Sequence, residues 1–127
     1  MQHEQALLQA GSSALPVDFS GVWRNQLGSR ATLTVTNGTV AGAYESAVSG
    51  EGQPITGQLT GYVNGDLISF VVNWPTAALT AWVGQMVNDD GHDVIITLWH
   101  MTTNIPEAAE PTRMWQSVFA GTDRFRR

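Results

Sequence analysis

The chain has 127 residues, which is enough for one domain with a single hydrophobic core. Its hydrophobic fraction of 43% is ordinary for a globular protein, whereas its charged fraction of 13% is about half the usual share, so part of the surface is expected to be covered by association. The net charge of −5 and the scattered or C-terminal positions of the six Lys+Arg residues argue against nucleic-acid binding and against a polybasic membrane patch.

Residues 1–16 are predicted to form a tail that precedes the domain, which spans residues 17–127. The tail has one short apolar patch at residues 6–8 and no basic start, so it is not expected to be an intact signal peptide. No apolar run approaches the roughly 18 residues of a membrane helix. Helix is expected at most at residues 4–10 of the tail or near residues 107–110.

From Phe19 onward the sequence predicts short β-strands separated by turn residues. Residues 30–36 alternate strictly between apolar and polar side chains, which is typical of a strand with one buried face. Asn37-Gly38 follows at once and favours a tight hairpin turn, because both central residues of that turn need positive φ. With Thr39 the same residues also form a glycosylation sequon, but the turn is the preferred interpretation. Strands are predicted at residues 19–25, 30–36, 40–48, 55–63, 67–74, 79–87, 93–102 and 113–124.

Most of the linkers between these strands are short and turn-like, as at residues 64–65 and 89–91, and a longer one covers residues 104–111. Eight sequential strands joined in this way predict an all-β protein, specifically an eight-stranded antiparallel up-and-down barrel.

The strand at residues 93–102 is apolar on both faces, although a barrel strand requires an apolar inner face only. An apolar outer face indicates burial against another chain, and the strand that follows repeats the pattern. A homo-oligomer is therefore predicted. The inner face carries Ile95, Thr97, Trp99 and Met101, and the outer face carries Val94, Ile96, Leu98 and His100.

The inner faces combine polar side chains with large aromatic ones close to strand ends, as with Tyr44 and Ser46 or Thr80 and Trp82. Small-molecule sites are mostly apolar with a few placed polar groups, and they occur in the mouths of β-barrels. Taken singly, a tryptophan is more often core, and a serine or asparagine beside a turn more often caps the backbone. The coincidence of phase and position is what predicts a ligand site.

Five motifs resemble the avidin–streptavidin family, in order and at compatible spacing. They lie at residues 23–29 (WRNQLGS), 42–48 (GAYESAV), 81–85 (AWVGQ), 97–99 (TLW), and 115–117 with 121–125 (WQS and GTDRF). The resemblance runs from about residue 19 to residue 125. It implies high-affinity, non-catalytic binding of biotin in the open end of the barrel, which sequesters the vitamin, and a secreted or periplasmic location. It implies no other cofactor.

Carried over position by position, the family pattern implies a contact with biotin for twelve residues. The ureido oxygen would accept hydrogen bonds from Asn25, Ser29 and Tyr44, and the two ureido N–H groups would donate to Ser46 and Asp123. Thr80 would face the sulfur of the biotin ring system. The bicyclic ring system and the side chain of biotin would be enclosed by Trp74, Trp82 and Trp99. The remaining contacts would come from Val48, from the backbone N–H of Gly50 at the ligand carboxylate, and from Met101 where relatives have a leucine.

Two further positions bear on the assembly and on the ligand tail. Trp115 matches a residue that caps a neighbouring subunit's site in tetrameric relatives, whereas dimeric relatives often lack it and carry cysteines. Because this chain has Trp115 and no cysteine, a tetramer is favoured over a dimer. Ala78 aligns where the family has a serine that hydrogen-bonds the biotin carboxylate, which predicts a weaker grip on the tail.

Catalysis and metal binding are not expected. His3, His92 and His100 lie far apart in sequence and phase, with no metal-ligand spacing, and there is no Ser–His pair or inward pair of carboxylates. Without cysteine there are also no thiolate ligands or nucleophiles. Two other functions stay open beside biotin binding: a barrel kept for structural or oligomeric interactions, and a carrier of a different small apolar molecule.

Overall fold

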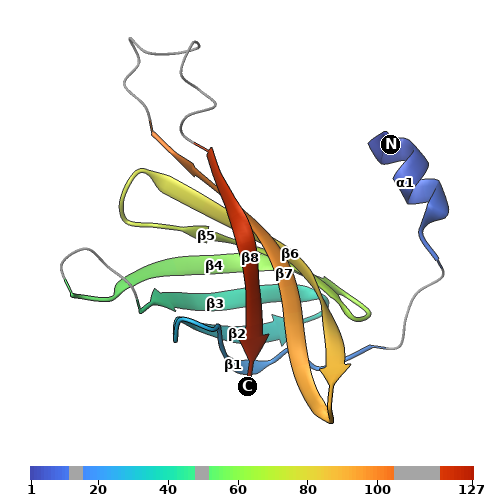
Figure 1. The fold of residues 1–127 in the computed structure, drawn as a ribbon, viewed down its shortest axis with the longest axis horizontal. Coiled ribbons are helices and arrows are strands. Elements are labelled where there is room, and N and C mark those ends of the chain that lie inside the picture. The colour runs from blue at the N-terminus through green and yellow to red at the C-terminus, as the bar shows by residue number, and fades with distance from the viewer. Residues whose placement is uncertain (12–15, 48–51, 105–117) are drawn as a thin grey trace.

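The computed structural model describes residues 1–11, 16–47, 52–104 and 118–127. Within these residues each strand pairs antiparallel with the next, and β8 returns to pair with β1, so that the sheet closes into a barrel. The predicted all-β, eight-stranded up-and-down barrel is confirmed. The elements (Figure 1) are α1 (His3–Gln9), β1 (Gly21–Arg24), β2 (Arg30–Thr36), β3 (Thr39–Ser46), β4 (Ile55–Asn64), β5 (Leu67–Asn73), β6 (Ala78–Asp89), β7 (His92–Thr103) and β8 (Val118–Arg126).

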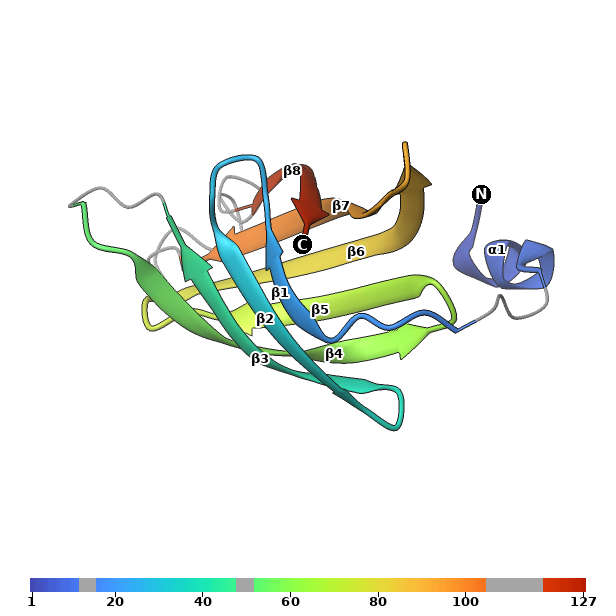
Figure 2. The same ribbon diagram turned by 90° about the horizontal axis from the view of Figure 1, so that it is seen from below.

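Two hairpin turns lie where the sequence predicted them. Asn37 and Gly38 join β2 to β3 with φ angles of 52° and 81°, the geometry that makes Asn-Gly the preferred pair in this turn. Asp90 and Gly91 join β6 to β7 with φ angles of 53° and 85°. Figure 2 shows the first of these hairpins, β2–β3, beside β4 and β5 in one curved sheet.

Some element ends differ from the prediction for local reasons. β1 stops at Arg24, one residue early, because Asn25 turns away to close the loop that follows. β6 and β7 extend past residues 87 and 93, because the turn at 90–91 is tight enough for pairing to continue to its edge. The turn between β4 and β5 uses residues 65–66 rather than 64–65, since Asn64 still pairs with Leu67.

In the tail, α1 begins and ends one residue earlier than predicted, and none of its residues is buried. The helix expected near residues 107–110 and the first part of the last predicted strand, residues 113–117, lie outside the described residues.

The core packs the inside of the barrel toward the end at which β8 finishes, here called the closed end. Phe19, Trp23, Phe70 and Phe125 are among its fully buried side chains. The indole N–H of Trp23 donates to the carbonyl oxygen of Phe19 at 2.9 Å, and the Arg127 guanidinium lies 4.3 Å from the centroid of the Trp23 ring. The opposite end, at which β3 finishes and β4 and β6 begin, is called the mouth.

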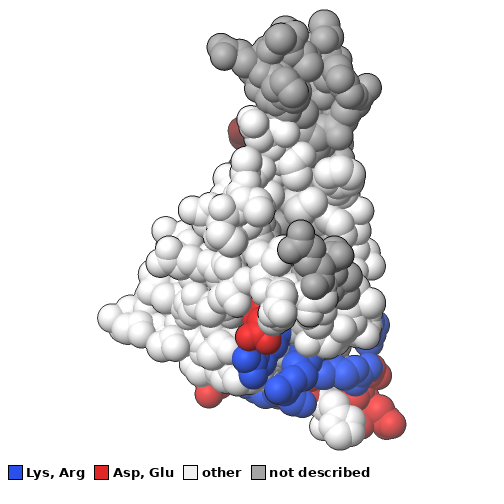
Figure 3. All heavy atoms as spheres, turned by 90° about the vertical axis from the view of Figure 1, so that its left-hand side faces the viewer, with Lys and Arg blue, Asp and Glu red and all other residues white. Residues whose placement is uncertain are grey.

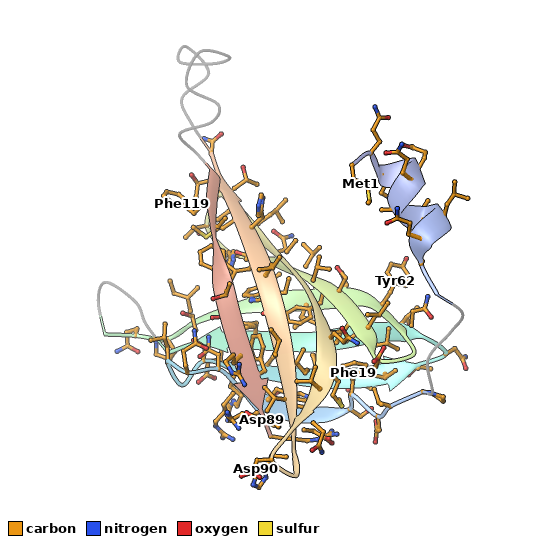
Figure 4. The ribbon with its side chains drawn as sticks, turned by 45° about the vertical axis from the view of Figure 1, so that its right-hand side comes forward. Met1, Phe19, Tyr62, Asp89, Asp90 and Phe119 are labelled. Atoms are coloured by element: carbon orange, nitrogen blue, oxygen red, sulfur yellow. The ribbon has the colours of Figure 1, made fainter. Side chains whose placement is uncertain are left out.

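Charged side chains gather at the closed end. Asp89 contacts Arg124 at 3.1 Å and Arg126 at 3.3 Å, and Asp93 contacts Arg127 at 3.2 Å. Figure 3 shows this charged end below a face that is largely free of charge, and Figure 4 shows Asp89 at the end opposite Phe119. Arg124, Arg126 and Arg127 are therefore held at the closed end, away from the mouth.

The outer face of β5, β6 and β7 is apolar and exposed. Val83 and Leu98 lie opposite each other across the β6–β7 ladder and are 60% and 65% exposed, and Ile96 is also exposed. This agrees with the predicted apolar outer face, with one correction. Val94, which was assigned to the same outer face, is already buried within the single chain beside Val87 and residue 126 in the register, so its burial requires no partner.

Candidate ligand-binding site

A cavity of about 190 Å³ lies inside the barrel toward the mouth. It brings together ten of the twelve residues that were predicted to contact a ligand, although they come from four strands (β3, β6, β7 and β8) and from the segments that follow β1 and β5. Its lining is Asn25, Leu27, Ser29, Tyr44, Ser46, Trp74, Thr80, Trp82, Trp99, Met101 and Asp123.

The loop between β1 and β2 fixes the orientation of Asn25. Its side-chain oxygen accepts hydrogen bonds from the backbone N–H groups of Leu27 at 3.0 Å and Ser29 at 2.9 Å. Gly28 permits the tight loop because its φ is 86°. Since the oxygen is held by the backbone, the side-chain nitrogen of Asn25 faces the cavity, where it donates to the Tyr44 hydroxyl at 3.2 Å.

Two hydroxyl groups, those of Tyr44 and Ser29, lie beside the Asn25 amide. The Ser29 hydroxyl hydrogen-bonds Tyr44, and its oxygen accepts from the backbone N–H of Ala47 at 3.0 Å. Burial raises the pKa of the Tyr44 phenol well above its usual range, and the negative charge of Asp123 acts in the same direction. The phenol is therefore a neutral hydrogen-bond donor at any physiological pH. Asn25, Ser29 and Tyr44 form a cluster of donors on one wall of the cavity.

Asp123 supplies the cavity with a carboxylate that is only 7% exposed. One of its oxygens accepts from the Gln26 side-chain nitrogen at 2.8 Å, and the other accepts from the Trp82 indole N–H at 2.9 Å. Both partners are neutral, and none of the ion pairs among the described residues involves Asp123. Each carboxylate oxygen keeps further acceptor capacity, so the group suits a ligand N–H.

Aromatic rings form the floor and the sides of the cavity. Trp82 is stacked between Tyr44, at a centroid distance of 4.8 Å, and Phe70, at 5.0 Å. Trp74 meets Tyr44 edge-on at 5.7 Å, and its indole N–H donates to the Thr80 hydroxyl oxygen at 2.9 Å. Because that oxygen is the acceptor, the Thr80 hydroxyl hydrogen is left to point toward a ligand atom such as sulfur.

The position of the third tryptophan, Trp99, depends on a neighbouring glycine. Gly121 faces Trp99 across the β7–β8 ladder, and a Cβ at this position would lie 2.6 Å from the indole ring. The glycine thus makes room for the ring. Trp74 and Trp99 are both only partly buried, so they form the sides of the cavity, whereas the buried Trp82 forms its floor.

A model of the avidin family matches residues 13–127 of this chain, which is nearly its whole length. The chain belongs to the avidin family. Avidin from Gallus gallus is 28% identical over 133 aligned residues, which cover 96% of this chain and 86% of avidin.

Solved structures of this avidin-family fold agree with the barrel described above. Xenavidin superposes with a TM-score of 0.76 at 26% identity, covering 87% of this chain and 96% of its own. A biotin-binding protein from chicken superposes with a TM-score of 0.75 at 27% identity, covering 87% of this chain and 95% of its own.

Within this avidin-family barrel, three residues predicted from the resemblance lie outside the described part of the chain: Val48, Gly50 and Trp115. Two residues of the site were not singled out from the sequence. Leu27 lines the cavity between Asn25 and Ser29, and its place in the motif at 23–29 was the available signal. Gln26 holds Asp123, but its partners lie 97 and 98 residues away, so no local pattern could have identified it.

A metal-binding cluster and a membrane-spanning helix are two features that the described residues of this avidin-family protein lack. No group of three or more His, Cys, Asp or Glu side chains among them could hold a metal ion. His100 lies on the exposed outer face, as predicted, and does not line the cavity. No described helix is long and apolar enough to cross a membrane.

Proposed function

We propose that this protein binds biotin with high affinity in the cavity of the barrel and sequesters it without catalysing a reaction. The observation that supports this most strongly is the pairing of a donor cluster with acceptors across one small cavity. A cyclic urea presents one carbonyl oxygen and two N–H groups. The oxygen suits Asn25, Ser29 and Tyr44, and the N–H groups suit Ser46 and Asp123.

The strength of binding would come from the surroundings of these groups. Three donors on one oxygen draw negative charge onto it, which strengthens the other bonds of the network in a low-dielectric interior. Trp74 and Trp99 offer apolar walls to the remainder of the bicycle, and Met101 adapts to irregular shapes. Family membership and the biotin-binding chicken neighbour support the same ligand.

We also propose that the protein works as a homo-oligomer, and as a tetramer rather than a dimer. The exposed apolar face that includes Val83 and Leu98 supports association. Trp115 would then cap the site of a neighbouring subunit, a role that remains a prediction from the resemblance.

Isothermal titration of the whole protein with biotin tests the function. We expect a dissociation constant well below micromolar, and an affinity weaker than that would refute the proposal. Competition by the parent cyclic urea, imidazolidin-2-one, at high concentration should reduce the signal, since it occupies the same donors and acceptors. A carrier of a different apolar ligand would be insensitive to it.

The carboxylate of Asp123 provides the variant for this test. Asp123→Ala should weaken biotin binding by about 2 kcal/mol or more, because a ligand N–H loses its charged acceptor. The matched control is Asp93→Ala, which removes a carboxylate paired with Arg127 at the closed end. An unchanged biotin dissociation rate in Asp123→Ala would show that this carboxylate does not contact the ligand.

A further inference from the structure

A buried glycine on the inner face of β4, Gly57, lies beside the candidate site without lining its cavity. It faces Tyr44 across the β3–β4 ladder. The β4–β5 ladder ends on this side with the pair Gln58 and Asn73, so Gly57 faces Trp74 one residue beyond that pair. Gly57 therefore lies in the register between two aromatic residues of the site.

The indole ring of Trp74 spans the inner wall from β4 to β6, across the end of β5. On the β6 side its N–H donates to the Thr80 hydroxyl oxygen at 2.9 Å. On the β4 side the opposite edge of the ring lies over Gly57, because a Cβ at this position would lie 3.1 Å from the Cε3 atom of Trp74. The ring also meets Tyr44 of β3 edge-on. A ring in this place requires a residue beneath it that has no side chain.

The space around Gly57 has no room for a methyl group. Besides its approach to Trp74, a Cβ would lie 2.5 Å from the Cγ1 atom of Val72 and 3.0 Å from the carbonyl oxygen of Asn73. Carbon atoms in contact normally lie about 3.5–4.0 Å apart, so the neighbours of an added methyl group must move. Val72 is fully buried in the core, whereas Trp74 is partly buried and borders the cavity. The indole therefore has space to move into.

The surroundings of Trp74 determine where a displaced ring would go. Its backbone is held in place, because its N–H donates to the Ala78 carbonyl oxygen at 3.3 Å. The bond from the indole to Thr80 already has the usual length of 2.9 Å, so the ring has no slack toward β6. It must turn into the cavity, whose volume is only about 190 Å³. A displaced ring thus takes space from a ligand and loses its bond to Thr80.

We propose that Gly57 is a positioning residue for ligand binding, because the absence of a side chain there lets Trp74 stand as one side of the cavity. This inference rests on the proposed function, since its measure is the binding of biotin. Gly121 has the corresponding relation to Trp99, and neither glycine lines the cavity. Two of the three tryptophans of the site therefore depend on a glycine of a nearby strand.

Biotin dissociation rates of four intact proteins test the inference: the wild type, Gly57→Ala, Trp74→Ala and the double variant. Gly57→Ala should release biotin roughly tenfold faster, the effect of a lost hydrogen bond and a displaced aromatic contact. In the double variant, Gly57→Ala should add no more than about twofold to the effect of Trp74→Ala, because the ring through which it acts is gone.

Two outcomes of this comparison would overturn the inference while the proposed function stands. One is a wild-type release rate in Gly57→Ala. The other is an equal increase with and without Trp74, which would mean that the glycine acts on the barrel as a whole. If the wild type does not bind biotin, the proposed function fails and the inference fails with it.

The close approach of Val72 calls for a second pair of variants, in case Gly57→Ala alone does not fold. Val72→Ala removes the Cγ1 atom that would lie nearest to the added methyl group and leaves the contact with Trp74. In this background Gly57→Ala should still speed biotin release roughly fivefold, and equal rates would overturn the inference. The matched control is Gln58→Ala, which places alanine at the next, exposed position of β4 and should release biotin at the wild-type rate. A comparable increase in the control would also count against a specific role of Gly57.

A measurement without ligand follows the ring itself. The indole N–H resonance that is missing from the NMR spectrum of Trp74→Ala identifies Trp74 in the isotope-labelled wild type. In Gly57→Ala this resonance should shift and its hydrogen should exchange faster with solvent, since the bond to Thr80 is lost. A resonance at its wild-type position would show that the ring has not moved and would overturn the inference.

Discussion

The side-chain amide of Asn25 makes both a structural hydrogen bond within its loop and a hydrogen bond at the cavity. Its oxygen closes the loop to Ser29, while its nitrogen reaches Tyr44 at the edge of the cavity. The usual function of an asparagine beside a turn is to cap the backbone. Here that capping bond determines which end of the amide a ligand meets. The structural and the functional interpretations of this residue are therefore not alternatives.

Tyr44 gives a prediction at the same scale, because its pKa is raised in the folded protein. In the unfolded chain the Tyr44 phenol ionises near pH 10, whereas the buried phenol of the folded protein stays neutral at that pH. The contribution of Tyr44 to the free energy of unfolding is therefore fully present below pH 10 and falls as the pH rises above it. Between pH 9 and pH 11 the free energy of unfolding should fall by about 1.4 kcal/mol on this account. In Tyr44→Phe that fall should be absent.

Chemical denaturation of both proteins at the two pH values measures the difference. The matched control is Tyr62→Phe, at a position that is 71% exposed, and it should lose stability with pH as the wild type does. An equal loss in Tyr44→Phe and the wild type would contradict the prediction. The chain has no lysine to obscure the comparison in this range.

At the scale of elements, the strands were predictable because their signals are local. The alternation at residues 30–36 and the turn at Asn37-Gly38 specify the β2–β3 hairpin without reference to the rest of the chain. The phase of each strand likewise predicted inner faces that combine polar and aromatic side chains, whereas the individual site residues came from the resemblance to the avidin–streptavidin family. What could not be predicted depends on distant partners, as with Gln26, or on a bond that ends a strand early, as at Asn25.

The seam between β1 and β8 is the shortest ladder in the barrel, with Arg24 and Arg126 as its one paired position. Gln26 extends it with its side chain, whose oxygen accepts from the backbone N–H of Arg124 at 3.1 Å and whose nitrogen holds Asp123 at 2.8 Å. The same amide thus closes the barrel and positions the acceptor of the candidate site.

Gln26→Ala should therefore weaken both the seam and the site. We expect biotin to dissociate roughly fivefold faster, because one hydrogen bond to Asp123 is lost. The backbone amide of Arg124 should exchange its hydrogen faster, which mass spectrometry or NMR can follow. The control Gln58→Ala, at an exposed position on β4, should change neither quantity. If the Arg124 amide exchanged its hydrogen faster while biotin dissociated at an unchanged rate, Gln26 would support the β1–β8 seam alone. That outcome would contradict the predicted effect of Gln26 on the site.

At the scale of the molecule, the distribution of charge predicts how copies associate. Carboxylates and arginines pair at the closed end, and the face of β6 and β7 that includes Val83 and Leu98 is left uncharged and apolar. Two such faces can pack together without desolvating an ion. This is the physical basis of the proposed oligomer.

Light scattering should give the mass of four chains for the wild type. Leu98→Arg places a charge on the proposed contact in every copy and should reduce that mass. Thr34→Arg, at an exposed position on β2, is the matched control and should leave the mass unchanged. A wild-type mass of two chains would rule out the tetramer, and an unchanged mass in Leu98→Arg would place the contact elsewhere.

The anchoring of Arg127 has a practical consequence. Its guanidinium is held by Asp93 at 3.2 Å, by the Ser20 carbonyl oxygen at 3.1 Å and by the Trp23 ring. Arg127 is thus fixed at the end of the barrel that lies opposite the mouth. A tether fused behind it would immobilise the protein on a sensor surface with its opening turned toward the sample, so attachment there should preserve capture capacity better than random coupling.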